Sequence, residues 1–247
     1  MANSIAGTER IAADARKLAQ LAAAWLTETL AGLSGDIRIA LSGGSTPREL
    51  YRLLGEDKTR MPWDRLQLYW GDERFVPHDD AESNYRMVRE SLLAHAPMSG
   101  ARIHPIPVDG TLRDAAERYE AELKQAYGAT TLSAARPLFD VILLGLGEDG
   151  HTCSLLPGQP VLEERRRWVA AVPSGRNEPR ITLTYPAVNA SRYTVFLVSG
   201  ASKASAVKRV RDGDLALPAA RIEPSGEVFW FIDAAAAGND GRRHAAA

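Results

Sequence analysis

The segment from Phe139 to Leu144 is almost continuously apolar, and the glycine-rich stretch 145–152 follows it at once. Such a short apolar run is typical of a parallel strand that is covered on both faces. Similar runs that end in polar segments occur at 37–41, 66–70 and 193–198, with helical periodicity between them. Strands that alternate with helices predict an α/β fold with a mainly parallel sheet flanked by helices.

The apolar spacing predicts helices over 8–32, 48–54, 81–93, 111–127 and 201–210. In the first of these, Leu18, Ala22 and Trp25 fall on one face of the helix. Thr46 and Pro47 form a good N-cap and first-turn pair for the second. Further strands are predicted at 168–172, 180–184 and 228–232.

The length of 247 residues favours one large domain over two small ones. We expect a single α/β domain over residues 1–235. Residues 236–247 are rich in Ala, Gly and Arg and offer no apolar surface to bury, so this C-terminal tail is predicted to be disordered.

Composition excludes several functional classes. The formal net charge is −1, without the basic excess of a nucleic-acid-binding protein. Cys153 is the single cysteine, so no internal disulfide can form. No apolar run approaches the roughly 20 residues of a membrane span, and the first ten residues lack the pattern of a secretory signal. We therefore expect a cytoplasmic protein, monomeric or a small homo-oligomer, with neither nucleic acid nor membrane as partner.

In open parallel sheets, ligands bind beyond the carboxyl ends of the strands. Polar or glycine-rich segments follow the predicted strands at 42–47, 71–74, 145–152 and 199–203. If the sheet is parallel, these segments meet at one edge. Their convergence predicts a binding site there.

The segment 42–47 has features of a phosphate-binding loop. Gly43 and Gly44 let the backbone approach a ligand closely, and the hydroxyls of Ser45 and Thr46 precede a helix whose N-terminus suits an anion. The segment is not a P-loop, because no Gly-Lys-Ser/Thr follows. The alternative is an ordinary strand-to-helix turn with a good cap.

Arg180 and Lys203 are the candidate cations for such a phosphate, since each lies beside a predicted strand that could reach the same edge. The alternative for both is a solvated surface charge.

His151 is the best candidate for acid–base chemistry, because histidine titrates nearest to neutral pH. Its loop formally matches the dinucleotide fingerprint through Gly145, Gly147 and Gly150, but prolines interrupt any long helix after it, so we reject that interpretation. The glycines more plausibly make a tight turn that presents Asp149 and His151. The remaining histidines lack metal-ligand spacing, so no metal and no cofactor is expected.

Two further groups could take part in the chemistry. Asp72 could orient the imidazole or a water molecule, and Arg74 could stabilise developing negative charge, although a local ion-pair cluster is an equally good interpretation. Cys153 lies close to His151 in sequence, so a Cys–His nucleophile is conceivable. A cysteine that simply fills space beneath the loop is the simpler explanation.

Taken together, these segments resemble the motifs of 6-phosphogluconolactonases, which share a superfamily with glucosamine-6-phosphate deaminases. The resemblance covers residues 10 to 233 and is carried by the segments 41–47, 71–77, 83–84, 145–152 and 180–184. It implies a modified Rossmann-like fold and a phosphorylated sugar lactone as substrate, hydrolysed to 6-phosphogluconate. It also implies that Gly43–Thr46, Arg180 and Lys203 hold the phosphate and that His151 is the general base, assisted by Asp72 and Arg74.

The deaminase branch of this superfamily is the close alternative. It typically carries a glutamate about five residues after the histidine, where this chain has Leu156, which cannot transfer protons. A sugar-phosphate sensor is a third possibility, but it should carry a helix-turn-helix and a basic face. The chain departs from the lactonase pattern at Cys153 and at 174–179, where a lysine is missing, which leaves the role of Arg176 open.

Overall fold

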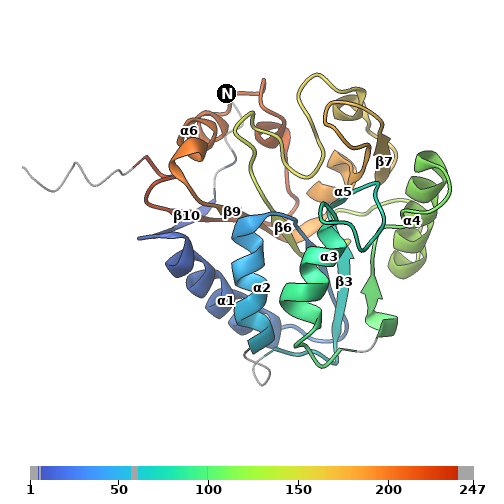
Figure 1. Cartoon of the computed structure of the whole chain (residues 1–247), viewed down its shortest axis with the longest axis horizontal. Helices are drawn as coiled ribbons and strands as arrows, with labels where there is room; N and C mark the ends of the chain where they lie inside the picture. Colours follow the sequence, from blue (N-terminus) through green and yellow to red (C-terminus); the bar gives the residue numbers. More distant parts are fainter. Residues whose placement is uncertain (1–4, 6, 57–60, 99, 239–247) are drawn as a thin grey trace, which may run out of the picture.

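The computed structural model describes residues 5, 7–56, 61–98 and 100–238, and its centre is a seven-stranded sheet whose paired strands all run parallel (Figure 1). The spatial order is β1-β10-β9-β6-β2-β3-β5. The predicted α/β class with a mainly parallel sheet is confirmed. In chain order the strands are β1 (Thr8–Ala12), β2 (Ile37–Leu41), β3 (Leu66–Trp70), β5 (Ile103–His104), β6 (Phe139–Leu144), β9 (Ser191–Val198) and β10 (Glu227–Asp233).

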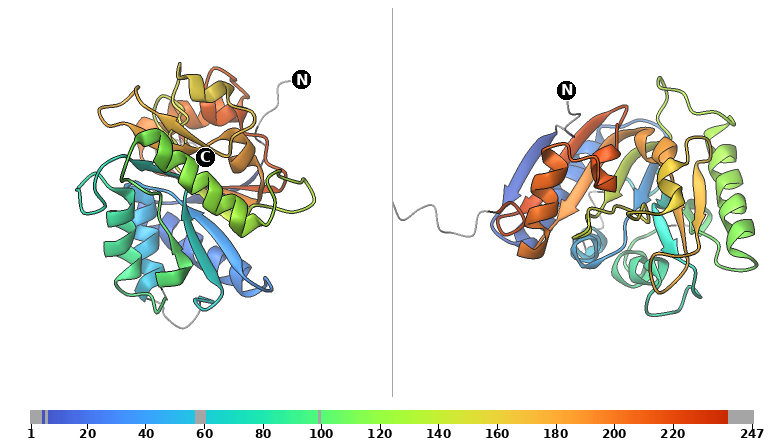
Figure 2. Two further views of the ribbon diagram at one scale, coloured as in Figure 1. Left: turned by 90° about the vertical axis from the view of Figure 1, so that its right-hand side faces the viewer. Right: turned by 90° about the horizontal axis from the view of Figure 1, so that it is seen from above.

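Helices cover both faces of this sheet (Figures 1 and 2). The chain crosses the sheet in one direction from β1 through β2 and β3 to β5, and it returns from β6 through β9 to β10. Since such crossovers are right-handed, the two directions place their helices on opposite faces. On one face lie α1 (Ala15–Ala31), α2 (Ser45–Glu56) and α3 (Asn84–Val88), and on the other lie α5 (Tyr185–Asn189) and α6 (Ala204–Arg211).

A smaller antiparallel sheet lies beside the large one. It has the order β4-β8-β7 and consists of β4 (Asp72–Arg74), β7 (Val169–Val172) and β8 (Arg180–Leu183). The helix α4 (Leu112–Tyr127) packs against β7 and β8. The strands predicted at 168–172 and 180–184 therefore form, but not in the parallel sheet. Because β4 and β8 pair, Arg74 lies directly across from Arg180.

The prediction of one helix over 8–32 is wrong in its first part. Thr8–Ala12 forms β1, which pairs with β10 at the far end of the chain, and local periodicity cannot reveal such a pairing. The helix starts only after Asp14, whose carboxylate accepts a hydrogen bond from the Lys17 N–H at 2.8 Å. The predicted buried face is confirmed, since Leu18, Ala22 and Trp25 are buried.

Other boundaries also differ from the prediction. The helix predicted at 48–54 begins at Ser45, so its cap position is Gly44 rather than Thr46. The helix predicted over 81–93 is α3, capped by Ser83, followed by one turn of π-helix at Arg89–Leu93. The segment predicted as a helix over 201–210 begins as a 3-10 turn. Short 3-10 turns lie at Gly100–Arg102, Pro160–Glu163, Ala201–Lys203 and Pro218–Arg221.

The neighbouring strands β2 and β6 mark the point where the chain direction across the sheet reverses. They pair through Ile39–Val141 and Ala40–Ile142, and the chain then leaves β2 toward β3 and β6 toward β9. Their carboxyl ends therefore open a crevice, which is where α/β sheets bind ligands.

At the carboxyl end of the chain, the ordered structure continues past residue 235. Ala236 is buried, its N–H donates to the Asp233 carboxylate at 2.8 Å, and the turn extends to Gly238. The rest of the predicted tail, 239–247, lies outside the described residues. Within the described chain, no helix is both long and apolar enough to cross a membrane.

Candidate active site

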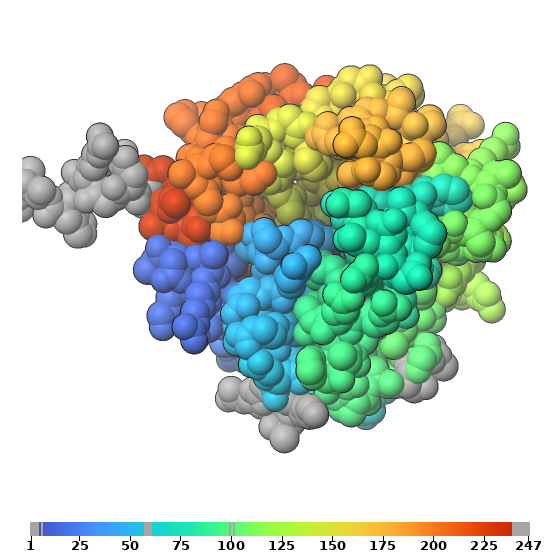
Figure 3. All heavy atoms as spheres, in the orientation of Figure 1, coloured from blue at the N-terminus to red at the C-terminus, as the bar shows by residue number. Residues whose placement is uncertain are grey.

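A cavity of about 230 Å³ opens at the carboxyl ends of β2, β3, β6 and β9. In the space-filling view, the segments around it meet near the middle of one face (Figure 3). Every residue predicted for the site lines this cavity, although these residues come from five separate segments of the sequence. Its wall comprises Ser42–Pro47, Asp72, Arg74, Asn84, Gly145–Gly147, His151–Cys153, Arg180, Leu197–Ser199 and Lys203.

The loop between β2 and α2 forms the floor of the cavity. The hydroxyl of buried Tyr51 donates to the Ser42 carbonyl at 2.8 Å and accepts from the Ser42 N–H at 3.0 Å, which fixes the start of the loop. Gly44 has φ of +106°, a conformation open mainly to glycine. The hydroxyls of Thr46 and Ser199 lie 2.7 Å apart and join the loop to the end of β9. The amino end of α2 thus faces the cavity and suits an anion.

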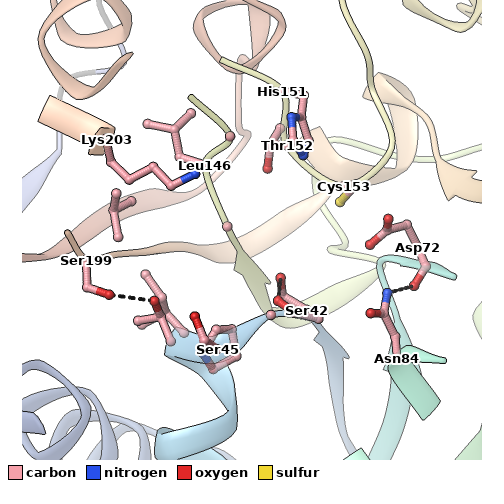
Figure 4. Close-up of a pocket in the computed structure, with 18 of the residues that line it drawn as sticks. Ser42, Ser45, Asp72, Asn84, Leu146, His151, Thr152, Cys153, Ser199 and Lys203 are labelled. Carbon is pink, nitrogen blue, oxygen red and sulfur yellow. Dashed lines mark hydrogen bonds between the residues drawn. The ribbon is translucent and has the colours of Figure 1, made fainter. Parts of the chain in front are cut away.

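Lys203 stands over this loop from the segment after β9. The Gly200 N–H donates to both oxygens of the buried Asp233 carboxylate, at 3.0 and 3.1 Å, which anchors the segment to the end of β10. The ammonium of Lys203 lies 4.0 Å from the Glu148 carboxylate. Figure 4 shows the end of the Lys203 side chain beside Leu146, on the same side of the cavity as Ser199.

His151 is held by Asp149 in the glycine-rich loop after β6. Nδ1 of His151 lies 2.5 Å from Oδ1 of Asp149. An ionised carboxylate can only accept, so Nδ1 donates the proton and Nε2 keeps a free lone pair. A β-carbon on Gly147 would overlap both side chains, so glycine is required for this arrangement. The geometry suits a general base.

Arg176 lies on the other side of the same carboxylate. Its Nη2 donates to Oδ2 of Asp149 at 2.6 Å and lies 3.2 Å from Nδ1 of His151. Partial burial alone would raise the pKa of Asp149, but the hydrogen bonds from Arg176 and His151 more than offset it and hold that pKa well below its ordinary value. Asp149 therefore stays ionised, as an anchor for the imidazole must.

Asp72 does not fill the orienting role that we predicted for it toward the imidazole. Its Oδ2 accepts from the Ser154 hydroxyl at 2.6 Å and lies 3.9 Å from a guanidinium nitrogen of Arg180. It lies on the strand β4, in the opposite wall from Lys203 (Figure 4). Its proposed role toward water stays a prediction.

A buried carboxylate shapes the turn that carries Asn84. Glu73 accepts hydrogen bonds from the backbone N–H groups of Asn84 and Tyr85, both at 2.7 Å, and from the Ser83 hydroxyl at 3.1 Å. Burial raises the pKa of Glu73, and these backbone bonds offset part of that effect. The result is a rigid turn whose amide side chain points at the cavity.

Asn84 in turn holds Arg74. Its Nδ2 donates to the Asp72 carbonyl at 2.9 Å, and its Oδ1 accepts from Nη1 of Arg74. Arg74 also donates to the Glu82 carbonyl at 2.9 Å. The guanidinium of Arg74 is therefore held by two partners, both through Nη1, before any ligand arrives.

Arg180 lies across from Arg74 and is largely buried. Burial lowers the pKa of Arg180, and the Asp72 carboxylate offsets part of this shift. Its ion pairs with Asp72 and Glu178 are both long, at 3.9 Å. Arg180 and Lys203 both line the cavity. In the part of the chain that the structure describes, neither cation makes a close contact with a carboxylate, so both can bind an anion.

Cys153 is a poor candidate for a nucleophile. Burial, reinforced by the charge of Asp72, raises the pKa of its thiol well above the ordinary value. The thiol therefore stays protonated at neutral pH. The sulfur lies close to Gly71, where a β-carbon would approach it to 3.1 Å, which supports the space-filling interpretation.

Sequence reasoning expected Asp149 in the turn beside His151 but gave it no role, gave none to Asn84, and left Arg176 open. The Asp-Gly-His turn was a usable signal for Asp149, because a tight glycine turn brings residues two apart together. No local signal exists for Arg176, which reaches the loop from the connection between β7 and β8.

Comparison with known proteins shows which family this chain resembles. A sequence model described as glucosamine-6-phosphate isomerases/6-phosphogluconolactonase matches residues 13–230. The chain is 40% identical to a 6-phosphogluconolactonase of Nostoc over 82% of this chain and 84% of that protein. It is also 40% identical to the rat 6-phosphogluconolactonase, over 89% and 87%. The solved structure of the Trypanosoma cruzi 6-phosphogluconolactonase superposes with a TM-score of 0.84 at 29% identity, covering 96% of this chain and 98% of that one.

The sequence identity to these lactonases extends over most of both chains. The family model and the fold of the solved structure point to the same family. The chain therefore belongs to the glucosamine-6-phosphate isomerase/6-phosphogluconolactonase family.

Proposed function

We propose that this protein hydrolyses 6-phospho-D-glucono-1,5-lactone to 6-phospho-D-gluconate. The observation that carries the proposal is a single one: the free Nε2 of His151 belongs to the same small cavity as the anion-binding loop of Gly43–Thr46. A general base and a phosphate site in one cavity suit a phosphorylated substrate whose lactone bond is hydrolysed. The names of the relatives reported above support the same reaction.

In this proposal the phosphate anchors the substrate. The hydroxyls and N–H groups of Gly43, Gly44, Ser45 and Thr46 surround it at the amino end of α2, and Lys203 neutralises its charge. Arg180 adds a second positive charge from the wall formed by β8. Binding at this remote group fixes the lactone carbonyl against His151.

The chemistry then needs water and the side chains of the cavity. Nε2 of His151 takes a proton from water as the water oxygen bonds to the lactone carbonyl carbon. Asp149 stabilises the imidazolium that forms, and Arg74 stabilises the oxyanion. The intermediate collapses by breaking the bond from that carbon to the ring oxygen. The imidazolium returns its proton to this oxygen, which becomes a hydroxyl.

The deaminase alternative has less support. Its glutamate position is occupied by Leu156, which is buried in the core. A sugar-phosphate sensor would bind the same ligands without turnover. The test is therefore an assay of purified protein against the phosphorylated lactone and against glucosamine 6-phosphate, with and without a chelator, beside His151→Gln.

We expect lactone hydrolysis that the chelator leaves unchanged. His151→Gln should lower kcat by about 10²–10⁴-fold at similar KM, as expected for loss of a general base. Turnover of glucosamine 6-phosphate alone, or binding without turnover, would replace the proposal with one of its alternatives. We further propose a cytoplasmic enzyme that is a monomer or small homo-oligomer, which fractionation and light scattering can check.

A further inference from the structure

The guanidinium of Arg176 completes a three-membered cluster with Asp149 and His151, and the reaction proposed above gives it no role. Oδ1 of Asp149 accepts from the imidazole at 2.5 Å and Oδ2 accepts from Nη2 of Arg176 at 2.6 Å. One carboxylate therefore serves two donors. Nη2 lies 3.2 Å from Nδ1. Both atoms carry hydrogens in this arrangement, so they do not hydrogen-bond to each other, and the guanidinium acts on the imidazole through its positive charge.

The segment that carries Arg176 is built to hold it there. Gly175 has φ of +99°, and a β-carbon at this position would come within 2.9–3.1 Å of the Gln159 side chain. The Ser174 hydroxyl donates to Gln159 Oε1 at 3.1 Å, and Nη1 of Arg176 donates back to the Gly175 carbonyl at 3.0 Å. Arg176, whose side chain is 35% exposed, is thus held by its own loop as well as by Asp149.

We propose that Arg176 is a positioning residue for the hydrolysis. Its guanidinium fixes the carboxylate that orients His151, and its positive charge opposes protonation of the imidazole. The proposal rests on the proposed function in one respect, that neutral His151 is the base. An isolated Asp–His pair favours the imidazolium, which cannot accept a proton from water. Arg176 places a positive charge beside the imidazole, and such a charge opposes that bias.

Other charged or titratable groups near His151 come from several elements around the cavity. Among the described residues, none of them makes a hydrogen bond or ion pair with the imidazole. They are Asp72 and Arg74 on β4, Arg180 on β8, Lys203 and its partner Glu148, and the thiol of Cys153. Since substitution of Arg176 leaves all of these in place, a change in the titration of His151 reports on Arg176.

The test compares Arg176→Met with Arg176→Lys in the pH dependence of kcat/KM. Loss of the charge should move the midpoint of the acidic limb upward by about 0.5–1 pH unit, a modest shift because the cluster is partly exposed. Arg176→Lys keeps the charge and should stay close to the parent. Arg113→Met, on the exposed face of α4, removes an arginine paired with Glu117 and is the matched control. It should shift nothing.

A second measurement does not depend on turnover. The His151 imidazole is titrated by NMR in the ligand-free protein, with its signal assigned from His151→Gln. Arg176→Met should raise the midpoint by the same amount. An unchanged or lowered midpoint in either measurement, or an equal loss of activity at every pH, overturns the proposal.

The two experiments also separate this proposal from the proposed function. An upward NMR shift in a protein without lactonase activity supports the electrostatic contact and rejects the hydrolysis. An active enzyme in which Arg176→Met leaves the titration of the His151 imidazole unchanged rejects the role of Arg176 alone.

Discussion

The side chain of Asn84 lies directly against the α-carbon of Gly43, so closely that a β-carbon at position 43 would overlap its amide group. The phosphate loop and the turn that holds Arg74 are therefore in contact through a glycine. Anion binding and oxyanion stabilisation, as proposed, depend on one packing contact.

Gly43→Ala should displace the Asn84 amide and, through it, Arg74. Since a misplacement of 1 Å can cost roughly 100-fold in rate, we expect kcat/KM to fall by about that factor. Steady-state kinetics measure this loss. Gly32→Ala is the control, because a β-carbon there meets only backbone oxygens at 3.5 Å or more. Full activity in Gly43→Ala would show that the loop can yield without disturbing Arg74.

Asn84→Ala should act through Arg74 rather than on the substrate directly. We expect a loss of kcat close to that of Arg74→Ala, because the guanidinium loses one of its fixed partners. A double-mutant cycle measures the coupling. The double variant should be little worse than Arg74→Ala alone, whereas additive losses would mean that the two side chains act independently.

Lys203→Ala should weaken substrate binding more than it slows the chemical step, because its ammonium stands at the phosphate end of the cavity. Loss of a charge-assisted hydrogen bond costs about 1.5–3 kcal/mol, so KM should rise roughly 10- to 150-fold. Lys208→Ala on α6 is the control, since that side chain is exposed and paired with Asp212. A fall in kcat at unchanged KM would contradict a phosphate role for Lys203.

The lowered pKa of Asp149 predicts how its contribution to stability changes with pH. A carboxyl whose folded pKa lies below its ordinary value of 3.8 stabilises the fold above that pH, and the contribution is lost as the pH falls below it. Asp149→Asn should therefore lower Tm at pH 7, and its difference from the parent should shrink below pH 3.8.

Thermal unfolding followed by circular dichroism at pH 7 and at several values below 3.8 measures this dependence. The exposed Asp64→Asn should change Tm little at any of these values. A difference between Asp149→Asn and the parent that stays constant with pH would mean that the ion pairs of Asp149 contribute nothing to stability.

The parallel sheet could be predicted because its strands are marked in the local sequence. Phe139–Leu144 is covered on both faces, so nearly every residue in it is apolar, and its predicted bounds are those observed. By contrast, Thr8–Ala12 is an edge strand that is mostly exposed, and only its pairing with β10 makes it a strand. Tertiary pairing of this kind leaves no local pattern to read.

The candidate site divides in the same way. Gly43–Thr46, His151 and Lys203 follow strands of the parallel sheet, and one rule about carboxyl ends was enough to bring them together. Arg180 reached the cavity by a different route, from the first position of an antiparallel strand. The partner of His151 was left open between Asp72 and other groups, because the sequence could not show which carboxylate the closed loop would bring to the imidazole; the structure places Asp149 there.

The pairing of β4 with β8 predicts that activity returns late when this protein refolds. Arg74 and Arg180 are neighbours across this ladder but distant along the chain. Bringing β4 and β8 together closes a long loop, which costs conformational entropy before the contacts between the strands can form. Such pairings therefore form slowly. Helical structure, which needs only near neighbours, should return first. The cavity becomes competent only when the small sheet closes against the large one.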